Sequence, residues 1–341
     1  MREGLFVISR GIGQVMFQNN AFSGILMLSG ILYSSWQLAL LAIIGNIIST
    51  ATAWICSYSR EDIKNGLYGF NGTLVGIAIG VFIEITWLSM LLLLITSALS
   101  TWITYLFSLQ HRLSGYTAPF ILSVWILLVG YHWIFPSLLL STTPVGAEPS
   151  SDFLRAFCLN IGQVMFQGNS ISGLLFLIAI AVNSRINAFY TALGSILPIV
   201  VAVLSGMDHA ILNAGLIGYN GVLCAIALGD KTIRSGVWCV CSILIITMAG
   251  YALGNYNPDC PFCHFRMDNH YIKEKPGENC IVYLKKGRRT PKLMVSFLLS
   301  INHSHTKTIS TLNYFLQPQQ RAHSVQRISG CNNQIRLIYH R

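Results

Sequence analysis

The sequence predicts an all-α polytopic membrane protein built from two related halves. Only 10% of its 341 residues are charged and the mean hydropathy is +0.57, whereas about a quarter of the residues are charged in an ordinary soluble protein. Lipid leaves helices or a closed barrel as the only ways to satisfy spanning backbone, and the apolar runs here do not alternate as barrel strands do. These runs are long enough for spans of about 20 residues and cover residues 24–58, 71–108, 117–141, 171–204 and 216–254.

Two phrases recur along the chain at one fixed distance. GIGQVMFQNNAFSG at residues 11–24 returns as NIGQVMFQGNSISG at residues 160–173, with ten of the fourteen positions identical. GLYGFNGTLVG at residues 66–76 returns as GLIGYNGVLCA at residues 215–225, again 149 residues later. Two separate blocks at one offset indicate an internal duplication, which in membrane proteins is typical of transporters and channels with a site at the repeat interface.

The duplication and the composition divide the chain into four parts. Residues 8–140 form the first transmembrane repeat, residues 141–152 a polar linker with two prolines, and residues 153–254 a second, truncated repeat. Residues 255–341 form a polar, basic tail. All of this follows from the printed sequence alone.

Nearly all of the net charge of +10 belongs to the tail. Residues 1–254 contain nine Lys or Arg and eight Asp or Glu, whereas residues 255–341 contain thirteen and four. The basic balance is therefore no sign of nucleic-acid binding by the helical part. Nine basic residues in short loops do not fix the membrane orientation from the sequence alone.

The tail contains a CPFCH phrase at residues 260–264. This spacing matches covalent haem attachment, and the neighbouring Cys and His residues would suit a zinc site. No second cysteine pair or regular ligand spacing supports either reading, so we expect no metal and no cofactor. The residues concerned are Cys260, Cys263, His264, His270 and Cys280.

A shifted reading frame explains the tail better. If the codons from Pro258 are read from their second base, they are compatible with LTAPFVIS(A/V)W, and Met267–Asp268 forces the Trp. The first half contains YTAPFILSVW at residues 116–125. We therefore interpret residues 255–341 as out-of-frame sequence that replaces the last span and is expected to be disordered.

The phrases GQVMFQ-N, GLYGFNG and TAPF, in this order, resemble those of the urea transporter family over residues 8–254. The compact length resembles the bacterial type. The resemblance implies two inverted repeats, each with five spans and a re-entrant pore helix, and one pore per subunit of a homotrimer in the bacterial inner membrane. It implies urea and small urea analogues as solutes. The family's signature octet begins Leu-Pro, whereas here it begins Leu113-Ser114.

A pore for a flat, neutral solute needs planar rings and paired polar groups. Phe17 follows Gln14 by three residues, as Phe166 follows Gln163, so each pair shares one helical face. The rings can stack on a planar solute, and the amides can both donate and accept. The resemblance implies that Phe70 and Tyr219 form the next ring layer, that Leu74 and Leu223 lie near the constriction, and that Thr117 supplies a central hydroxyl. Asn71 and Asn220 are expected to cap re-entrant helices that begin at the GFNG and GYNG phrases.

Three other classes of function are less compatible with the sequence. An ion- or proton-coupled transporter usually exposes an intramembrane Asp, Glu or Lys, and here the only clear candidate is Glu84, which has no charged counterpart in the other half. An ammonium channel needs paired pore histidines, and none of His111, His132 and His209 recurs in the other half. A membrane enzyme would need a nucleophile–base or metal cluster, which residues 1–254 do not show. We therefore expect passive transport of urea, with this chain inactivated by loss of its last span.

Overall fold

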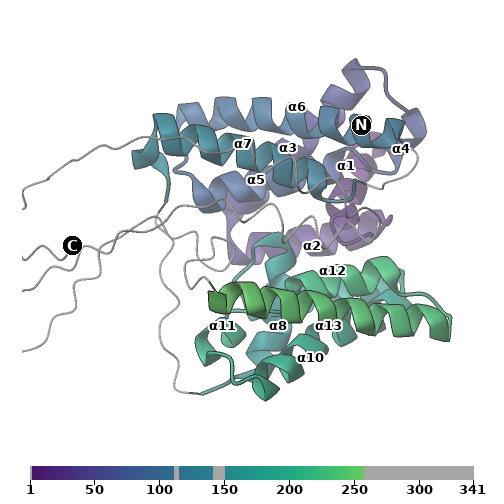
Figure 1. The fold of residues 1–341 in the computed structure, drawn as a ribbon. Helices are drawn as coiled ribbons and strands as arrows, with labels where there is room; N and C mark the ends of the chain where they lie inside the picture. The colour runs from purple at the N-terminus through teal and green to yellow at the C-terminus, as the bar shows by residue number, and fades with distance from the viewer. Residues whose placement is uncertain (1, 111–114, 141–149, 257–341) are drawn as a thin grey trace, which may run out of the picture. The chain divides into compact units, whose positions relative to one another are not determined.

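The computed structural model describes residues 2–110, 115–140 and 150–256, which lie in a compact unit of residues 1–266. These residues form helices and one isolated bridge between Ile83 and Leu139, so the predicted all-α class is confirmed. Figure 1 shows the arrangement. The first repeat contains α1 (Arg2–Gln14), α2 (Ala21–Ser34), α3 (Trp36–Ile55), α4 (Arg60–Lys64), α5 (Gly69–Phe82), α6 (Trp87–Leu109), α7 (Ala118–Ile134) and η1 (Pro136–Leu138).

The second repeat follows the same order. It contains α8 (Phe153–Gly162), η2 (Gln163–Met165), α9 (Ser170–Asn183), α10 (Arg185–Leu204), α11 (His209–Asn213), α12 (Tyr219–Leu228) and α13 (Ile233–Tyr256). Among the described residues, α3, α6, α10 and α13 are each long and apolar enough to cross a membrane, and α8–η2 with α9 forms a fifth, bent candidate. The protein is therefore a multi-pass membrane protein.

The duplication extends to the ends of the helices. Asn20 accepts from the first backbone N–H groups of α2, and Asn169, 149 residues later, does the same for α9. Ser35 caps α3 and Ser184 caps α10 in the same way. An oxygen-bearing side chain before a helix satisfies backbone donors that have no partner within the helix. The repeated caps therefore start α9 and α10 at the residues equivalent to the starts of α2 and α3.

The sharpest break in each repeat lies in the QVMFQ phrase. Phe17 and Phe166 adopt left-handed backbone angles, with φ of 58° and 56°. In the second repeat the segment Phe153–Met165 meets α9 at 74°, the geometry of a broken span or re-entrant loop. The GFNG and GYNG phrases instead begin the short, continuous helices α5 and α12. α5 and α12 are too short to count among the spanning helices, and the expectation that these phrases start re-entrant helices stays a prediction.

Glycines allow the helices of each repeat to pack backbone to backbone. A Cβ atom on Gly45 of α3 would overlap the carbonyl oxygen of Gly72 on α5. In the equivalent pair of the second repeat, a Cβ atom on Gly194 would lie 2.6 Å from the carbonyl oxygen of Gly221, which is also too close. Such contacts are typical of helix pairs in membranes, where small residues let the backbones approach.

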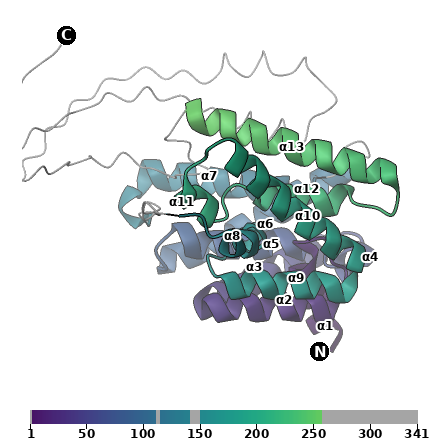
Figure 2. The same cartoon turned by 90° about the horizontal axis from the view of Figure 1, so that it is seen from below.

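The two repeats meet mainly along α2 and α9, which lie side by side in Figure 2. The hydroxyl of Ser172 on α9 donates to the carbonyl oxygen of Gly30 on α2 at 2.7 Å. Phe176 lies against the same glycine, where a Cβ atom would meet its ring at 2.8 Å. The interface therefore consists of a large ring on one helix and a glycine on the other.

The described part of the second repeat ends with α13. By the order of the first repeat, a counterpart of α7 would come next, in residues 257–341, which lie outside the described residues. The haem and zinc candidates of the CPFCH phrase, from Cys260 to Cys280, also lie there. Ser114, the departure from the family's octet, is likewise outside the described residues, in the segment 111–114.

Candidate functional site between the repeats

The two left-handed phenylalanines are held by the glutamines that follow them. Gln18 and Gln167 are fully buried. Each donates its side-chain N–H to the carbonyl oxygen two residues earlier, that of Met16 or Met165, at 2.6 Å. These hydrogen bonds close the turn around the phenylalanine. Because the turn is the same in both repeats, Phe17 and Phe166 occupy equivalent positions.

Gln14 and Gln163 are also oriented in the same way. Nε2 of Gln14 donates to the carbonyl oxygen of Asn65 at 3.0 Å, and Nε2 of Gln163 donates to that of Ala214 at 3.1 Å. Both side chains are half-buried. One N–H of each amide is therefore engaged, and the amide oxygen is oriented as an acceptor.

The start of α7 lies between the two aromatic turns. The ring of Tyr116 contacts Phe17 of the first repeat, with centroids 5.5 Å apart. The ring of Phe120 contacts Phe166 of the second repeat, with centroids 6.1 Å apart. Thr117 lies between these two residues in the chain, is half-buried, and makes no side-chain cap bond. The structure therefore brings Phe17, Phe166 and Thr117 into one region, beside the N-terminal end of α7.

Asn71 on α5 joins the start of α7 to α6 by hydrogen bonds. Its Oδ1 accepts from the backbone N–H of Phe120 at 3.3 Å, and its Nδ2 donates to the hydroxyl of Thr104 at 3.1 Å. The expectation that Asn71 caps its own helix is corrected, because α5 begins without a side-chain cap and the asparagine instead serves the first turn of α7. No side-chain cap is found for α12 either, so Asn220 does not cap its helix.

The remaining expected site residues lie on α5 and α12. Phe70 is half-buried in the first turn of α5, and Tyr219 is half-buried at the equivalent place in α12. Leu74 is 2% exposed, whereas Leu223, its counterpart, is half-buried. α12 contacts η2, the segment just before Phe166, and the role of these four residues in lining a path stays a prediction.

The candidate site consists of neutral side chains. Within the described ranges no group of three His, Cys, Asp or Glu residues could hold a metal ion. Glu84, the one carboxylate considered for coupling, is exposed in the turn between α5 and α6, and its backbone N–H donates to the carbonyl oxygen of Leu138. The carboxylate considered for coupling therefore lies in an exposed turn.

One polar pair lies outside this site and was not predicted. Ser151 Oγ lies 2.6 Å from Nδ1 of His209, beside a small open pocket at one end of the helices. The neighbouring carboxylates cap helices, since Asp152 accepts from Arg155 N and Asp208 from Ala210 N. Among the described residues no third group orients the histidine, as a catalytic triad requires. No nucleophile–base pair was expected in residues 1–254, and this pair corrects that expectation.

A family model described as urea transporter matches residues 5–261. The chain belongs to the urea transporter family. It is 34% identical over 244 residues to rat urea transporter 1, an alignment that covers 65% of this chain and 62% of the rat protein. It is 28% identical over 330 residues to goat urea transporter 1, covering 83% and 84%. The chain thus matches less than two thirds of the length of the rat protein.

Several residues of this family member's candidate site were missed by the sequence analysis. Phe82 contacts Phe166 with centroids 5.7 Å apart, and Tyr116 and Phe120 contact the two phenylalanine turns. Tyr116 precedes the TAPF phrase and Phe120 is its last residue, so their place beside Thr117 was a signal in the sequence. Phe82, at the end of α5, has no counterpart in the second repeat, where Lys231 stands at the same offset.

Proposed function

We propose that this protein passes urea down its concentration gradient along a path between the two repeats. The supporting observation is that the start of α7 lies between two identically folded phenylalanine turns, one from each repeat. A path at a repeat interface is the common arrangement in transport proteins with internal symmetry. The names of the rat and goat relatives agree with urea as the solute.

The chemistry of the lining suits urea. Urea is flat and neutral, with one carbonyl acceptor and four N–H donors. Aromatic rings stack on a planar solute for about 1 kcal/mol per contact. The oriented amide oxygens of Gln14 and Gln163 accept N–H groups, and the hydroxyl of Thr117 donates to or accepts from the solute. The positive N-terminal end of α7 disfavours cations at the same place. Small urea analogues share these groups, so we include them as solutes.

Proton coupling and catalysis fit the site less well. A coupled transporter needs an ionisable group along the path, whereas the side chains around the phenylalanine turns are neutral and Glu84 is exposed in a turn. The Ser151–His209 pair lies at one end of the helices and lacks an orienting third group among the described residues. We therefore assign passive transport and no enzymatic activity.

We further propose that this chain, as written, conducts urea poorly because its last span is absent. In the first repeat, five residues of α5 on one helical face are at most 2% exposed. Their counterparts on α12 are all more exposed than this, and Leu228 reaches 43%. Positions i, i+3, i+4, i+7 and i+8 form one stripe along a helix. α7 covers this stripe of α5 in the first repeat, whereas the equivalent stripe of α12 in the second repeat is uncovered. The pairs are Asn71 and Asn220, Leu74 and Leu223, Val75 and Cys224, Ala78 and Ala227, and Ile79 and Leu228.

The experiment that tests the proposal is stopped-flow urea uptake in proteoliposomes. The chain as written is compared with a frame-restored version, in which the gene is read from the second base of codon 258. In the restored version, Phe17→Leu and Phe166→Leu are each expected to lower urea permeability about fivefold, because one stacking contact of about 1 kcal/mol is lost. Phe189→Leu is the matched control, because Phe189 is 64% exposed on α10.

Each part of the proposal has an outcome that contradicts it. Equal and high urea flux from both versions would show that the last span is not needed. Unchanged flux in Phe17→Leu and Phe166→Leu would show that the phenylalanine turns do not line the path. Flux in the restored version that collapses when a proton gradient is removed would establish coupled transport.

The assembly and the membrane are also proposals. The resemblance of the sequence to bacterial-type urea channels leads us to propose a homotrimer in a bacterial inner membrane. Each subunit would then contain its own path. The mass of the detergent-solubilised frame-restored protein, measured by light scattering, tests the trimer, and a monomer or dimer would contradict it.

A further inference from the structure

α5 is about one helical turn longer than its counterpart α12. α5 has fourteen residues and ends at Phe82, whereas α12 has ten and ends at Leu228, the residue equivalent to Ile79. The position equivalent to Phe82 is Lys231, which is exposed in the loop before α13. The extra turn of α5 therefore carries a phenylalanine that the second repeat does not have at the equivalent place.

Phe82 makes the phenylalanine turn of the second repeat different from that of the first. The ring of Phe166 is contacted edge to face by two rings of the first repeat: by Phe82, with centroids 5.7 Å apart and planes at 85°, and by Phe120, with centroids 6.1 Å apart and planes at 67°. The ring of Phe17 is contacted in this way by Tyr116. Edge-to-face contacts are a favoured arrangement of aromatic pairs, so Phe82 restricts the ring of Phe166.

The backbone around Phe82 is held by the segment that follows α7. Its carbonyl oxygen accepts from the backbone N–H of Leu140 at 3.0 Å, and the backbone N–H of Glu84 donates to the carbonyl oxygen of Leu138 at 2.9 Å. Between these bonds lies the isolated antiparallel bridge at Ile83, whose side chain is 1% exposed. The first repeat by itself therefore fixes the backbone from which this ring projects.

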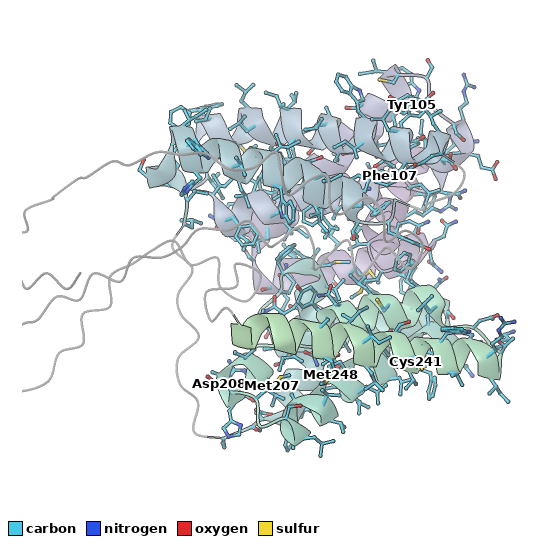
Figure 3. All side chains as sticks on the ribbon, viewed as in Figure 1. Tyr105, Phe107, Met207, Asp208, Cys241 and Met248 are labelled. Carbon is cyan, nitrogen blue, oxygen red and sulfur yellow. The ribbon has the colours of Figure 1, made fainter. Side chains whose placement is uncertain are left out.

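Phe82 and the Phe166 turn lie at the same end of the helices. α6 begins five residues after Phe82 and runs to the end at which Tyr105 lies, at the right of Figure 3. The turn around Phe166 is joined to the other end, because Gln163 donates to the carbonyl oxygen of the residue directly after α11. Asp208, directly before α11, lies at the left of Figure 3. The end of α5 in one repeat therefore meets the phenylalanine turn of the other.

The turn around Phe17 receives no such ring from α12. Gln14 in that turn donates to the carbonyl oxygen of Asn65, just before α5, so the fourteen residues of α5, about 20 Å at 1.5 Å per residue, separate the turn from Phe82. In the inverted arrangement the end of α12 would approach Phe17, but α12 stops one turn earlier. A restored last span would bring a counterpart of Phe120, but none of Phe82, because α12 would keep its length.

We propose that Phe82 is a specificity-determining residue, which positions the ring of Phe166 so that the path rejects solutes thicker than the flat urea molecule. This inference rests on the proposed function, since it assigns Phe82 a role in the same path. A ring packed against two neighbours turns aside less easily for a methyl group than a ring with space beside it. The turn around Phe17 is therefore expected to admit methylated ureas more readily, and the turn around Phe166 is the step that excludes them.

Solute selectivity in proteoliposomes tests this role. In the frame-restored protein, Phe82→Leu is expected to raise the permeability ratio of N-methylurea to urea at least about threefold, part of the tenfold or more by which an apolar pocket distinguishes one methyl group. Urea permeability itself is expected to stay within about twofold of the parent, because the ring of Phe166 remains in the path. Phe82→Tyr keeps a ring at this position and should retain the parent ratio. Phe22→Leu is the matched control, because Phe22 is 56% exposed on α2.

The outcomes separate this role from the proposed function. If Phe166→Leu lowers urea permeability but Phe82→Leu leaves the ratio unchanged, the specificity role is wrong and the path between the repeats is unaffected. If Phe82→Leu lowers the permeability of urea and N-methylurea equally, Phe82 is only structural, which also overturns the proposal. If the frame-restored protein passes no urea, the proposed function fails and the specificity role fails with it.

A double-mutant cycle in the chain as written measures the ring contact without transport. The melting temperature in detergent is compared for Phe82→Leu, Phe166→Leu and both together. The double variant is expected to lose less than the sum of the two single losses, because the second substitution removes a contact that is already lost. Phe82→Leu with Phe17→Leu is the control pair and is expected to be additive, because α5 separates these residues. Additive losses for Phe82 and Phe166 would show that the two rings do not support each other, and would overturn the proposal.

Discussion

The amide of Asn183 in the second repeat donates a 2.8 Å hydrogen bond to the amide oxygen of Gln18 in the first. Gln18 is buried and closes the turn around Phe17. A residue of the second repeat therefore stabilises the phenylalanine turn of the first repeat. The equivalent bond is missing at the other turn: Gln167 Oε1 is buried and has no partner among the described residues, and Ser34 stands at the position equivalent to Asn183.

The asymmetry predicts opposite effects of two reciprocal substitutions on stability. Ser34→Asn is expected to stabilise the protein by about 1 kcal/mol, because it offers an amide donor to the unpaired oxygen of Gln167. Asn183→Ser is expected to destabilise it by about 1 to 3 kcal/mol, because it leaves the oxygen of Gln18 buried and unpaired. Thermal unfolding in detergent measures both. A lower melting temperature for Ser34→Asn would refute the equivalence of the two turns.

A second prediction concerns the close contact of α3 and α5. Gly45→Ala is expected to cost about 1 to 3 kcal/mol, because the added methyl group would overlap the backbone of Gly72 and the helices cannot shift freely. Gly130→Ala is the matched control. Gly130 lies within α7 with no atom within 4 Å of an added Cβ, so this change is expected to stabilise α7 by up to about 1 kcal/mol through helix propensity. Equal effects in thermal unfolding would argue against backbone contact.

A third prediction uses the repeat as its own control. Asn71→Ala is expected to cost about 1 to 3 kcal/mol, because it removes the hydrogen bonds to Thr104 and Phe120 and leaves the backbone N–H of Phe120 without its side-chain acceptor. Asn220→Ala is expected to have little effect in this chain, because Asn220 is half-buried and the described residues give its side chain no partner. In the frame-restored version, Asn220→Ala is expected to approach the cost of Asn71→Ala. If Asn220→Ala leaves the stability of the frame-restored version unchanged, the restored span does not pack against α12 as α7 packs against α5.

A fourth prediction concerns pH. Urea flux through the frame-restored protein is expected to be constant between about pH 6 and pH 9, because glutamine, threonine and phenylalanine side chains do not titrate there. Flux that follows a single protonation in this range would point to an ionisable group in the path. Uptake at several pH values, without a pH gradient, measures this.

A fifth prediction concerns the tyrosines beside α4 and the loss of stability at alkaline pH. Burial, with the nearby Asp62 carboxylate, raises the pKa of Tyr68 to about 12, and burial also raises the pKa of Tyr58. A raised folded pKa contributes stability that is present below the unfolded value of about 10 and is lost as the pH rises toward 12. Tyr68→Phe should therefore flatten the loss of stability between about pH 10 and pH 12. An unchanged slope would contradict the shift.

Part of the fold was visible in the sequence because hydropathy and helix caps are local. The apolar runs predicted the helices, and Asn20, Asn169, Ser35 and Ser184 start four of them at the expected offset. The repeat also identified Phe17 and Phe166 as equivalent residues, and the structure adds that both have left-handed backbone angles. What the spacing did not predict was that Asn71 serves α7, because that contact joins residues 49 positions apart.

One pair of mismatches shows why three-dimensional contacts were needed. At the repeat offset Gly11 corresponds to Asn160, and Asn46 corresponds to Ser195. In each repeat one asparagine fills the same space, from α3 in the first and from α8 in the second, against Gly69 or Gly218. The sequence shows two unrelated substitutions. The structure shows one side chain supplied from either of two neighbouring helices.

The sequence by itself determined that this chain is a duplicated, helical membrane protein of the urea transporter family, because apolar length and repeated motifs are properties of the chain order. Only the tertiary structure decided which ends of the helices share a side of the membrane and which side chains meet between the repeats. Those relations depend on the opposite directions of the two repeats and on close packing, and neither is encoded in spacing along the chain.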